Sequence, residues 1–351
     1  MSQGPAVLHE LSYHDDHHDS DIKVTVVETT ELSAHYKVYE CDQGVLEALT
    51  DQLQRRQDYV EFASTNWVHP LKNESDVVLR RTERAVTERV PLHVILLQSI
   101  NAMSASVLNC DPSFQQRWHP DSKWIDISAE QPAQCEGPDG LRVQVRANLG
   151  TQSRTTCNVY RRFLLAHIPT LAIESLTIRE NTSMLPDQVL AQRAGMVPVR
   201  YRDGKIPPTH FDNACFRVQL SVPVDSPRTI TPLTTQRMDP MISDVCLAFT
   251  GADLGFELAV LSPGQSVEAI AQVGVACAAQ HVKHVAVGQV GIQTSDSDTH
   301  PSMDQSFALT FYLCGQLPGP TCFKSASRAI LHTLTGLRQG VSLATSKAVQ
   351  E

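Results

Sequence analysis

The spacing of apolar residues in the first third of the chain predicts two strands, a helix, two more strands and a second helix. Apolar and polar residues alternate over 22–29 and 35–41, which is typical of an antiparallel pair of strands. Over 42–57 the apolar residues recur at helical spacing, and two short strands around a proline-containing turn follow over 59–83. A second apolar stripe of helical period covers 92–107. Together these elements predict one α+β unit.

The same rhythm restarts after the middle of the chain. A strand pattern over 141–149 precedes a helical pattern from Thr155 to His167. A strand over 171–178 and a short helix that ends at Gly195 come next. A block of strands and turns then leads to one more alternating strand, SFALTFYL, and to a final helix from Pro320 to Gly336. The second half thus repeats the first with a β-rich block inserted, which predicts an internal pseudo-dimer.

These patterns divide the chain into two α+β dimerisation domains that pair within one molecule. The predicted divisions are a disordered tail over 1–20, a first dimerisation domain over 21–110, a linker over 111–139, a second dimerisation domain over 140–200 and 294–345, and a β-rich inserted domain over 201–293. The linker is rich in proline and has no sustained period, so we expect it to have no core of its own. The residues predicted to form the pseudo-dimer core are Leu46, Leu49, Leu53, Leu96, Ile100, Phe163, Leu164, Ile330 and Leu334.

Composition narrows the class of protein. The chain has 351 residues, of which 42% are hydrophobic and 19% charged, as in ordinary globular proteins with more than one compact unit. With 29 Lys and Arg against 38 Asp and Glu, the net charge of −9 argues against nucleic-acid binding through the overall field. No apolar run approaches the roughly 20 residues of a membrane span. The N-terminal residues also lack the pattern of a signal peptide, so we expect an intracellular protein.

Motifs for catalysis or metal binding are missing from the sequence. The nine cysteines include no CxxC pair, which argues against a zinc ribbon or a disulfide framework. There is no nucleophile elbow, no phosphate-binding loop, no HExxH and no carboxylate cluster suited to two magnesium ions. His281 and His284 lie three residues apart, but no Cys or carboxylate accompanies them at ligand spacing. We therefore predict no cofactor, no metal and no catalytic residue.

One stretch carries a specific family resemblance. The sequence NVYRRFLLAHIPTLAIESLTIRENTSMLPDQVLAQRAGMVPV, over 158–199, resembles the third-largest subunit of eukaryotic RNA polymerase II and its archaeal counterpart. The segments CDQGVLEALTDQL and YVEFASTNWVHPLKNESDVVLR, before the linker, resemble the smaller partner, which is the eleventh subunit of polymerase II or its archaeal counterpart. Both partners are α-like subunits, normally made as separate chains. Here they look fused with the small one first, as in some large DNA viruses.

The resemblance implies a function without chemistry of its own. It predicts a non-catalytic assembly platform in a multisubunit DNA-directed RNA polymerase, with the active site on partner subunits. The implied partners are the largest, second-largest and small polymerase subunits, with no membrane contact and no direct sequence-specific binding of nucleic acid. The chain would form an internal pseudo-heterodimer rather than a homo-oligomer. The implied location is the nucleus or cytoplasm of a host cell, or the virion of a virus.

The family's inserted domain often holds zinc through four cysteines, and this chain departs from that pattern. Between residues 200 and 293 the only cysteines are Cys215, Cys246 and Cys277, each about thirty residues from the next. We therefore predict that the inserted domain binds no zinc.

Two adjacent arginines, Arg161 and Arg162, interrupt the apolar helix of the second half. At about 100° per residue they flank Leu165 on the side opposite the apolar stripe. Such a patch is either a solvated helix face or a protein interface. The resemblance implies that Arg161, Arg162 and Leu165 contact the second-largest subunit, and that the first-half helix around Gly44–Leu49 faces the largest.

Two alternatives from other classes remain open. One is a stand-alone adaptor that keeps the α-like fold but binds another protein. The other is an enzyme that uses Cys and His chemistry on an unrelated scaffold.

Overall fold

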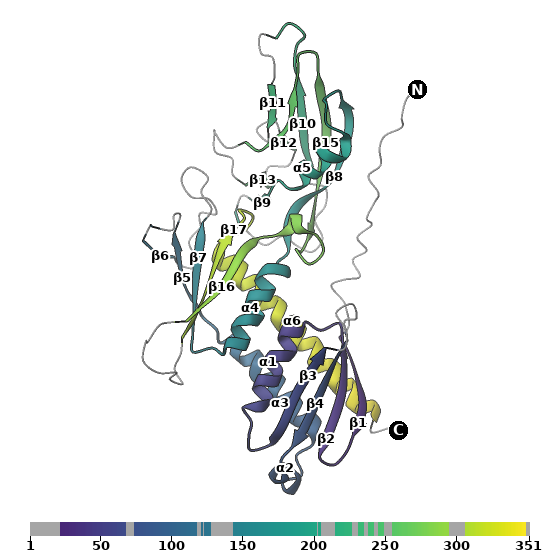
Figure 1. Cartoon of the computed structure of the whole chain (residues 1–351), viewed down its shortest axis with the longest axis vertical. Coiled ribbons are helices and arrows are strands. Elements are labelled where there is room, and N and C mark those ends of the chain that lie inside the picture. The colour runs from purple at the N-terminus through teal and green to yellow at the C-terminus, as the bar shows by residue number, and fades with distance from the viewer. Residues whose placement is uncertain are drawn as a thin grey trace.

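The computed structural model describes most of the chain, and Figure 1 shows the arrangement of its elements. The described residues are 22–67, 74–117, 121, 123–127, 143–201, 203–204, 215–226, 231–234, 238–241, 245–248, 255–294 and 306–348. The predicted disordered tail over 1–20 lies outside this part of the chain, as do residues 68–73, where most of the predicted proline-containing turn falls, and much of the predicted linker. The fold mixes helices with several antiparallel sheets, in agreement with the α+β prediction.

The first part of the chain forms a four-stranded antiparallel sheet with helices on one face. Its strand order is β1-β2-β4-β3. The strands are β1 (Lys23–Thr29), β2 (Ser33–Tyr39), β3 (Val60–Trp67) and β4 (Glu74–Arg81). The helices are α1 (Gln43–Gln54), a short α2 (Glu83–Thr87) and α3 (Leu92–Leu108). Every second residue of β2 and β4 is buried, which gives the sheet one apolar face and one mixed face.

A second, five-stranded antiparallel sheet has the order β16-β17-β7-β5-β6. Its strands are β5 (Ser113–Arg117), β6 (Ile125–Ile127), β7 (Gln144–Gly150), β16 (Val287–Thr294) and β17 (Phe307–Leu313). The sequence predicted a linker without a core of its own where β5 and β6 lie. The structure forms two strands there that the periodicity did not predict, and they add to the sheet that holds β7. The alternation was hard to recognise because β5, SFQQR, buries one aromatic residue, Phe114, and one polar residue, Gln116.

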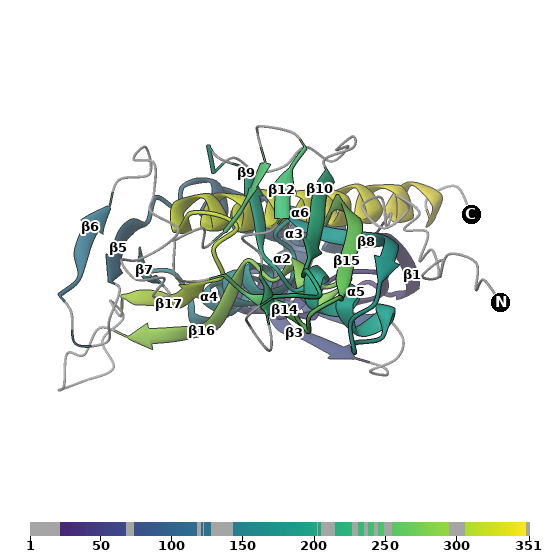
Figure 2. The same cartoon turned by 90° about the horizontal axis from the view of Figure 1, so that it is seen from above.

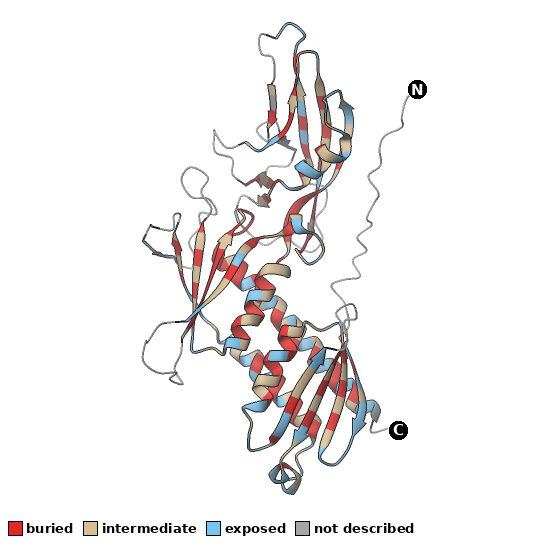
Figure 3. Ribbon diagram, viewed as in Figure 1, coloured by how far each residue is buried: buried red, intermediate tan, exposed pale blue. Residues whose placement is uncertain are grey.

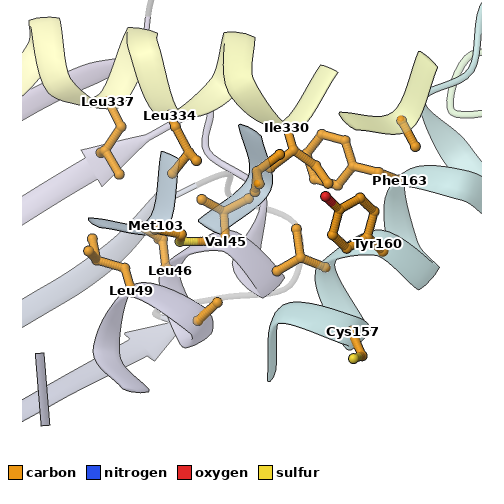
Figure 4. Packing of buried hydrophobic residues seen from close by; sticks show 14 of the residues in the cluster. Val45, Leu46, Leu49, Met103, Cys157, Tyr160, Phe163, Ile330, Leu334 and Leu337 are labelled. Atoms are coloured by element: carbon orange, nitrogen blue, oxygen red, sulfur yellow. The ribbon is translucent and has the colours of Figure 1, made fainter. Parts of the chain in front are cut away.

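Four helices lie between the two sheets and join their cores. α4 (Arg154–Ala166) packs against α1, and α6 (Gly319–Ala348) packs against α3, α4 and β1. The buried sides of these helices face one another in Figure 3, and Figure 4 shows side chains from all four that point toward a common centre. The structure buries all nine residues predicted for this core in one cluster.

Helix α6 continues well beyond its predicted end at Gly336. At 30 residues it is about 45 Å long, and it runs lengthwise from the β7 end of the molecule to the β1 end (Figure 2). Gly336 suggested a helix end, yet Gly336 and the later Gly340 both lie in close contact with the residues at the start of the first sheet. A Cβ atom on Gly340 would lie 2.8 Å from the carbonyl oxygen of Ile22 and 2.9 Å from Cγ2 of Val24. These glycines therefore let α6 lie directly against β1.

A second hydrophobic cluster forms a separate β-rich unit. Its main sheet has the order β12-β10-β15-β8, beside the two-stranded pairs β11-β14 and β13-β9. The strands are β8 (Thr170–Asn181), β9 (Val199–Tyr201), β10 (Cys215–Ser221), β11 (Thr231–Thr234), β12 (Met238–Pro240), β13 (Val245–Leu247), β14 (Glu257–Leu261) and β15 (Ser266–Ala276). Helix α5 (Asp187–Gly195) packs on β8, and a short 3-10 helix, η4 (Val282–His284), follows β15.

The two hydrophobic clusters place the limits of the β-rich unit elsewhere than the predicted inserted domain over 201–293. β8 and α5 contribute Leu171, Ile173 and Leu190 to the second cluster, whereas β16 belongs to the five-stranded sheet. The long pairing of β8 with β15 explains the difference, because it draws the start of β8 into the β-rich unit. None of the helices among the described residues is both long and apolar enough to cross a membrane.

Candidate partner-binding surface

Helix α4 carries the candidate surface and is fixed by its own sequence. The Ser153 hydroxyl caps the helix by accepting a hydrogen bond from the Thr156 amide at 3.1 Å. Its inner side is buried in the core between the sheets. The buried residues of α4 are Thr156, Cys157, Val159, Tyr160, Phe163 and Leu164. The opposite side of the helix is available for contacts with other parts of the chain or with a partner protein.

Arg162 lies on that opposite side but faces the first half of the chain. Its Nη2 donates to Oδ2 of Asp42 at 2.8 Å, and its Nε donates to Oδ1 at 3.0 Å. The Asp42 side chain is 13% exposed and that of Arg162 is 41% exposed. The hydrogen bond to Asp42 is the main reason that the pKa of Arg162 is raised above its ordinary value. The guanidinium of Arg162 is therefore engaged within the chain, which the helical pattern did not predict. Its contact with the second-largest subunit, implied by the resemblance, stays a prediction.

Asp42 has a second role at the start of α1. Its Oδ1 accepts a hydrogen bond from the Gly44 amide at 2.8 Å and so caps the helix. The Arg162 side chain passes directly over Gly44, where a Cβ atom would lie 2.7 Å from Cδ of Arg162. One carboxylate thus fixes the end of α1 and binds α4, and the glycine makes room for the arginine.

A second polar contact follows the seam between α1 and α4. Oγ1 of Thr155 donates to Oδ2 of Asp51 at 2.9 Å. Asp42 at the start of α1 meets the end of α4, and Asp51 near the end of α1 meets the start of α4. The two helices are therefore antiparallel and held at both ends by polar contacts.

Arg161 is the exposed arginine of the pair. Its Nε donates to the carbonyl oxygen of Val290 in β16 at 3.3 Å, and its Nη1 donates to Oδ1 of Asn158 at 3.3 Å. Leu165, which we expected to be exposed beside it, is half-buried against the core cluster. Of the three predicted interface residues, Arg161 is exposed, whereas Arg162 and Leu165 are half-buried.

The stretch Gly44–Leu49, expected to face the largest polymerase subunit, is mostly inside the molecule. The buried residues in it are Gly44, Val45, Leu46, Ala48 and Leu49. Only Glu47 in this stretch is exposed. The expectation is wrong for these side chains, because they form part of the shared core.

The histidines near η4 do not form a metal site among the described residues. His281 caps η4 by accepting from the Lys283 amide, whereas His284 is buried with its Nδ1 3.0 Å from the carbonyl oxygen of Thr170. Burial lowers the pKa of His284 to about 4, so its ring is neutral near pH 7. No group of three or more His, Cys, Asp or Glu side chains in the described part of the chain is arranged to hold a metal ion.

Sequence reasoning missed Asp42 as a functional partner of Arg162. The signal available was local: an aspartate two residues before a glycine at the start of an apolar helical stripe is typical of a helix N-cap. That pattern predicts the cap but not the arginine 120 residues away.

Curated relatives resemble parts of the chain. No family model matches the chain. It is 38% identical over 71 residues to DNA-directed RNA polymerases I and III subunit RPAC1 of Mus musculus, covering 18% of this chain and 20% of that one. It is 47% identical over 51 residues to DNA-directed RNA polymerase II subunit RPB3 of Schizosaccharomyces pombe, covering 14% and 17%. Over 139 residues it is 30% identical to DNA-directed RNA polymerase subunit Rpo3 of Natronomonas pharaonis, covering 39% and 51%.

These similarities are partial. The matched region is about a fifth of the length of RPAC1 and about half that of Rpo3. The three relatives are all subunits of DNA-directed RNA polymerases, which supports an α-like polymerase subunit with a part in transcription.

Proposed function

We propose that this chain is a non-catalytic subunit of a multisubunit DNA-directed RNA polymerase and serves as a platform on which larger subunits assemble. The single observation that carries the proposal is the similarity to three polymerase subunits from a mammal, a yeast and an archaeon. RNA synthesis and its metal ions belong, in this proposal, to the partner subunits.

The chain acts as a fused pair of α-like subunits. The first half takes the place of the small partner and the second half that of the large one. The support is the arrangement in which α1 and α3 of one half pack against α4 and α6 of the other and share a single core. The β-rich unit with its own cluster takes the place of the large partner's inserted domain.

The outer side of α4 binds the second-largest subunit, with Arg161 as the central contact. Arg161 is exposed, and its guanidinium is steadied by Val290 and Asn158, so less side-chain entropy is lost when a carboxylate binds it. Arg162 contributes indirectly by holding α4 against α1. The largest subunit and small subunits bind elsewhere on the chain, and the complex works in the nucleus or cytoplasm of a host cell or in a virion.

The test is purification of the tagged chain from the cells or virions in which it is made. The proposal predicts that two large polymerase subunits are recovered with it and that the assembly synthesises RNA on a DNA template. Recovery of neither large subunit would reject the proposal and favour the stand-alone adaptor.

The proposed docking face is tested separately in the same purification. Arg161→Glu reverses the exposed charge and is expected to reduce recovery of the second-largest subunit at least tenfold, since loss of about 1.4 kcal/mol suffices for that. Arg338→Glu, on the exposed side of α6, is the matched control and should leave recovery unchanged. Equal recovery with both variants would show that the second-largest subunit binds another face.

A further inference from the structure

Strand β5 is tied closely to the first half of the chain, although it lies in the sheet of the second. Only residues 109–112 separate the end of α3 from Ser113. Because an extended chain spans at most about 3.6 Å per residue, β5 can reach no more than roughly 18 Å from the end of α3. The position of β5 is therefore tied to that of α3 and of the first half of the chain.

Within the second sheet, β5 occupies an interior position beside β7. It pairs with β7 from Ser113 opposite Asn148 to Arg117 opposite Gln144, and β6 pairs with its other side. Without β5, the edge of β7 would present unpaired amide and carbonyl groups, which readily pair with a strand from another molecule. The strand that covers the edge of β7 is therefore one that is tethered to the first half of the chain.

Phe114 anchors this strand in the shared core. Its ring is 7% exposed and meets Phe323 of α6 edge-on, with ring centroids 5.8 Å apart. Phe323 in turn stacks on Tyr160 of α4, with centroids 4.6 Å apart. An aromatic ring buried among aromatic partners contributes more than backbone pairing alone. The Asn148 side chain adds a hydrogen bond to the Ser113 hydroxyl at 3.1 Å.

We propose that β5 makes the pairing of the two halves exclusive to one chain. It fills in cis the sheet edge through which the second half would otherwise take up the first half of another copy. To exchange between copies, α3 and β5 must both detach from the second half at the same time. The reason is that residues 109–112, which join them, are too short to let one stay bound while the other pairs with a second molecule. The pairing therefore outlasts a break in the backbone between β6 and β7. This inference rests on contacts within the chain and does not depend on the polymerase function.

A cut chain tests the proposal directly. A site for a sequence-specific protease is inserted after Gln134 in the full chain, which carries a different tag at each end, and the folded protein is then cleaved. The two pieces are expected to stay together on gel filtration and on resin for either tag. In the presence of excess uncut chain with a third tag, neither piece should appear on the third tag after overnight incubation. Separation or exchange of the wild-type pieces would overturn the proposal.

Substitutions in β5 locate the effect. Phe114→Ala in the cut chain should speed dissociation or exchange of the pieces by on the order of 100-fold, because removal of a buried aromatic ring is among the most disruptive core changes. Phe62→Ala is the matched control, since Phe62 is 51% exposed on β3, and it should change nothing. Equal rates for the two variants would contradict the role given to β5.

A second variant decides the matter if Phe114→Ala fails to fold before cleavage. Gln115→Pro removes one backbone donor from an interior strand and leaves the aromatic cluster intact. The uncut variant is checked by circular dichroism, and after cleavage its pieces should separate faster than those of the wild type. Pieces that stay paired as firmly as the wild type's would overturn the proposal.

Discussion

The contact of Asp42 with Arg162 offers a quantitative test of how the two halves are held together. Asp42 both caps α1 and binds the guanidinium fork of α4. Asp42→Ala removes both the cap and the contact with Arg162, whereas Arg162→Ala removes only the contact. The double variant loses the cap and the contact, the same two interactions as Asp42→Ala alone. A double-mutant cycle therefore separates the cap from the contact between the halves.

The magnitudes follow from the geometry of this contact. Loss of a helix cap costs about 1 kcal/mol. A hydrogen-bonded charge pair contributes ~1.5–3 kcal/mol when buried, but Arg162 is 41% exposed, so screening by solvent lowers this to about 1 kcal/mol. We therefore expect losses of about 2 kcal/mol for Asp42→Ala, about 1 kcal/mol for Arg162→Ala and about 2 kcal/mol for the double variant, which is a coupling energy of about 1 kcal/mol.

Urea unfolding followed by circular dichroism measures these changes in the free energy of unfolding, provided that the slope with denaturant stays constant. The matched control is the cycle for Arg84 and Asp58, an ion pair on the surface with both side chains mostly exposed, which should show no measurable coupling. If the Asp42 and Arg162 cycle shows no more coupling than this control, the contact does not help to hold the two halves together.

Further predictions concern close packing and a buried histidine. Gly340→Ala should lower the free energy of unfolding by about 1–3 kcal/mol in urea, because its Cβ meets backbone of Ile22, whereas Gly195→Ala in α5, with ordinary contacts, should not lower it. His284 has a folded pKa of about 4 against an ordinary 6.5, so the unfolded chain binds the proton more readily as pH falls. Its contribution to stability is complete above pH 6.5 and falls by about 3 kcal/mol as pH drops towards 4. Urea midpoints measured across this range should fall less steeply for His284→Gln than for the wild type, and equal slopes would refute this role.

The apolar periodicity of the sequence was enough to predict the shared core. Leucines at helical spacing, such as Leu46 and Leu49, form an apolar stripe that packs against the core, and the structure buries them. The alternating strands of the first half were visible for the same reason, because one face of the sheet packs against helices.

Contacts between distant parts of the chain were not visible in that periodicity. The helical pattern placed Arg162 on the side of its helix away from the core. It gave no sign that Asp42, at the start of another helix, lies beside that side. β5 was hidden because only one of its residues, Phe114, is apolar and buried. The extension of α6 was missed because Gly336 weakens a helix locally, while the close fit of α6 against β1 at Gly340 appears only in three dimensions.

We propose that one chain takes the place of two α-like subunits in a polymerase. Native mass spectrometry of the assembly purified through this chain tests this proposal most directly, since it counts the copies of each subunit. We expect one copy of this chain, one of each large subunit and no separate α-like subunit. Two copies of the chain, or one copy accompanied by a separate α-like subunit, would contradict it.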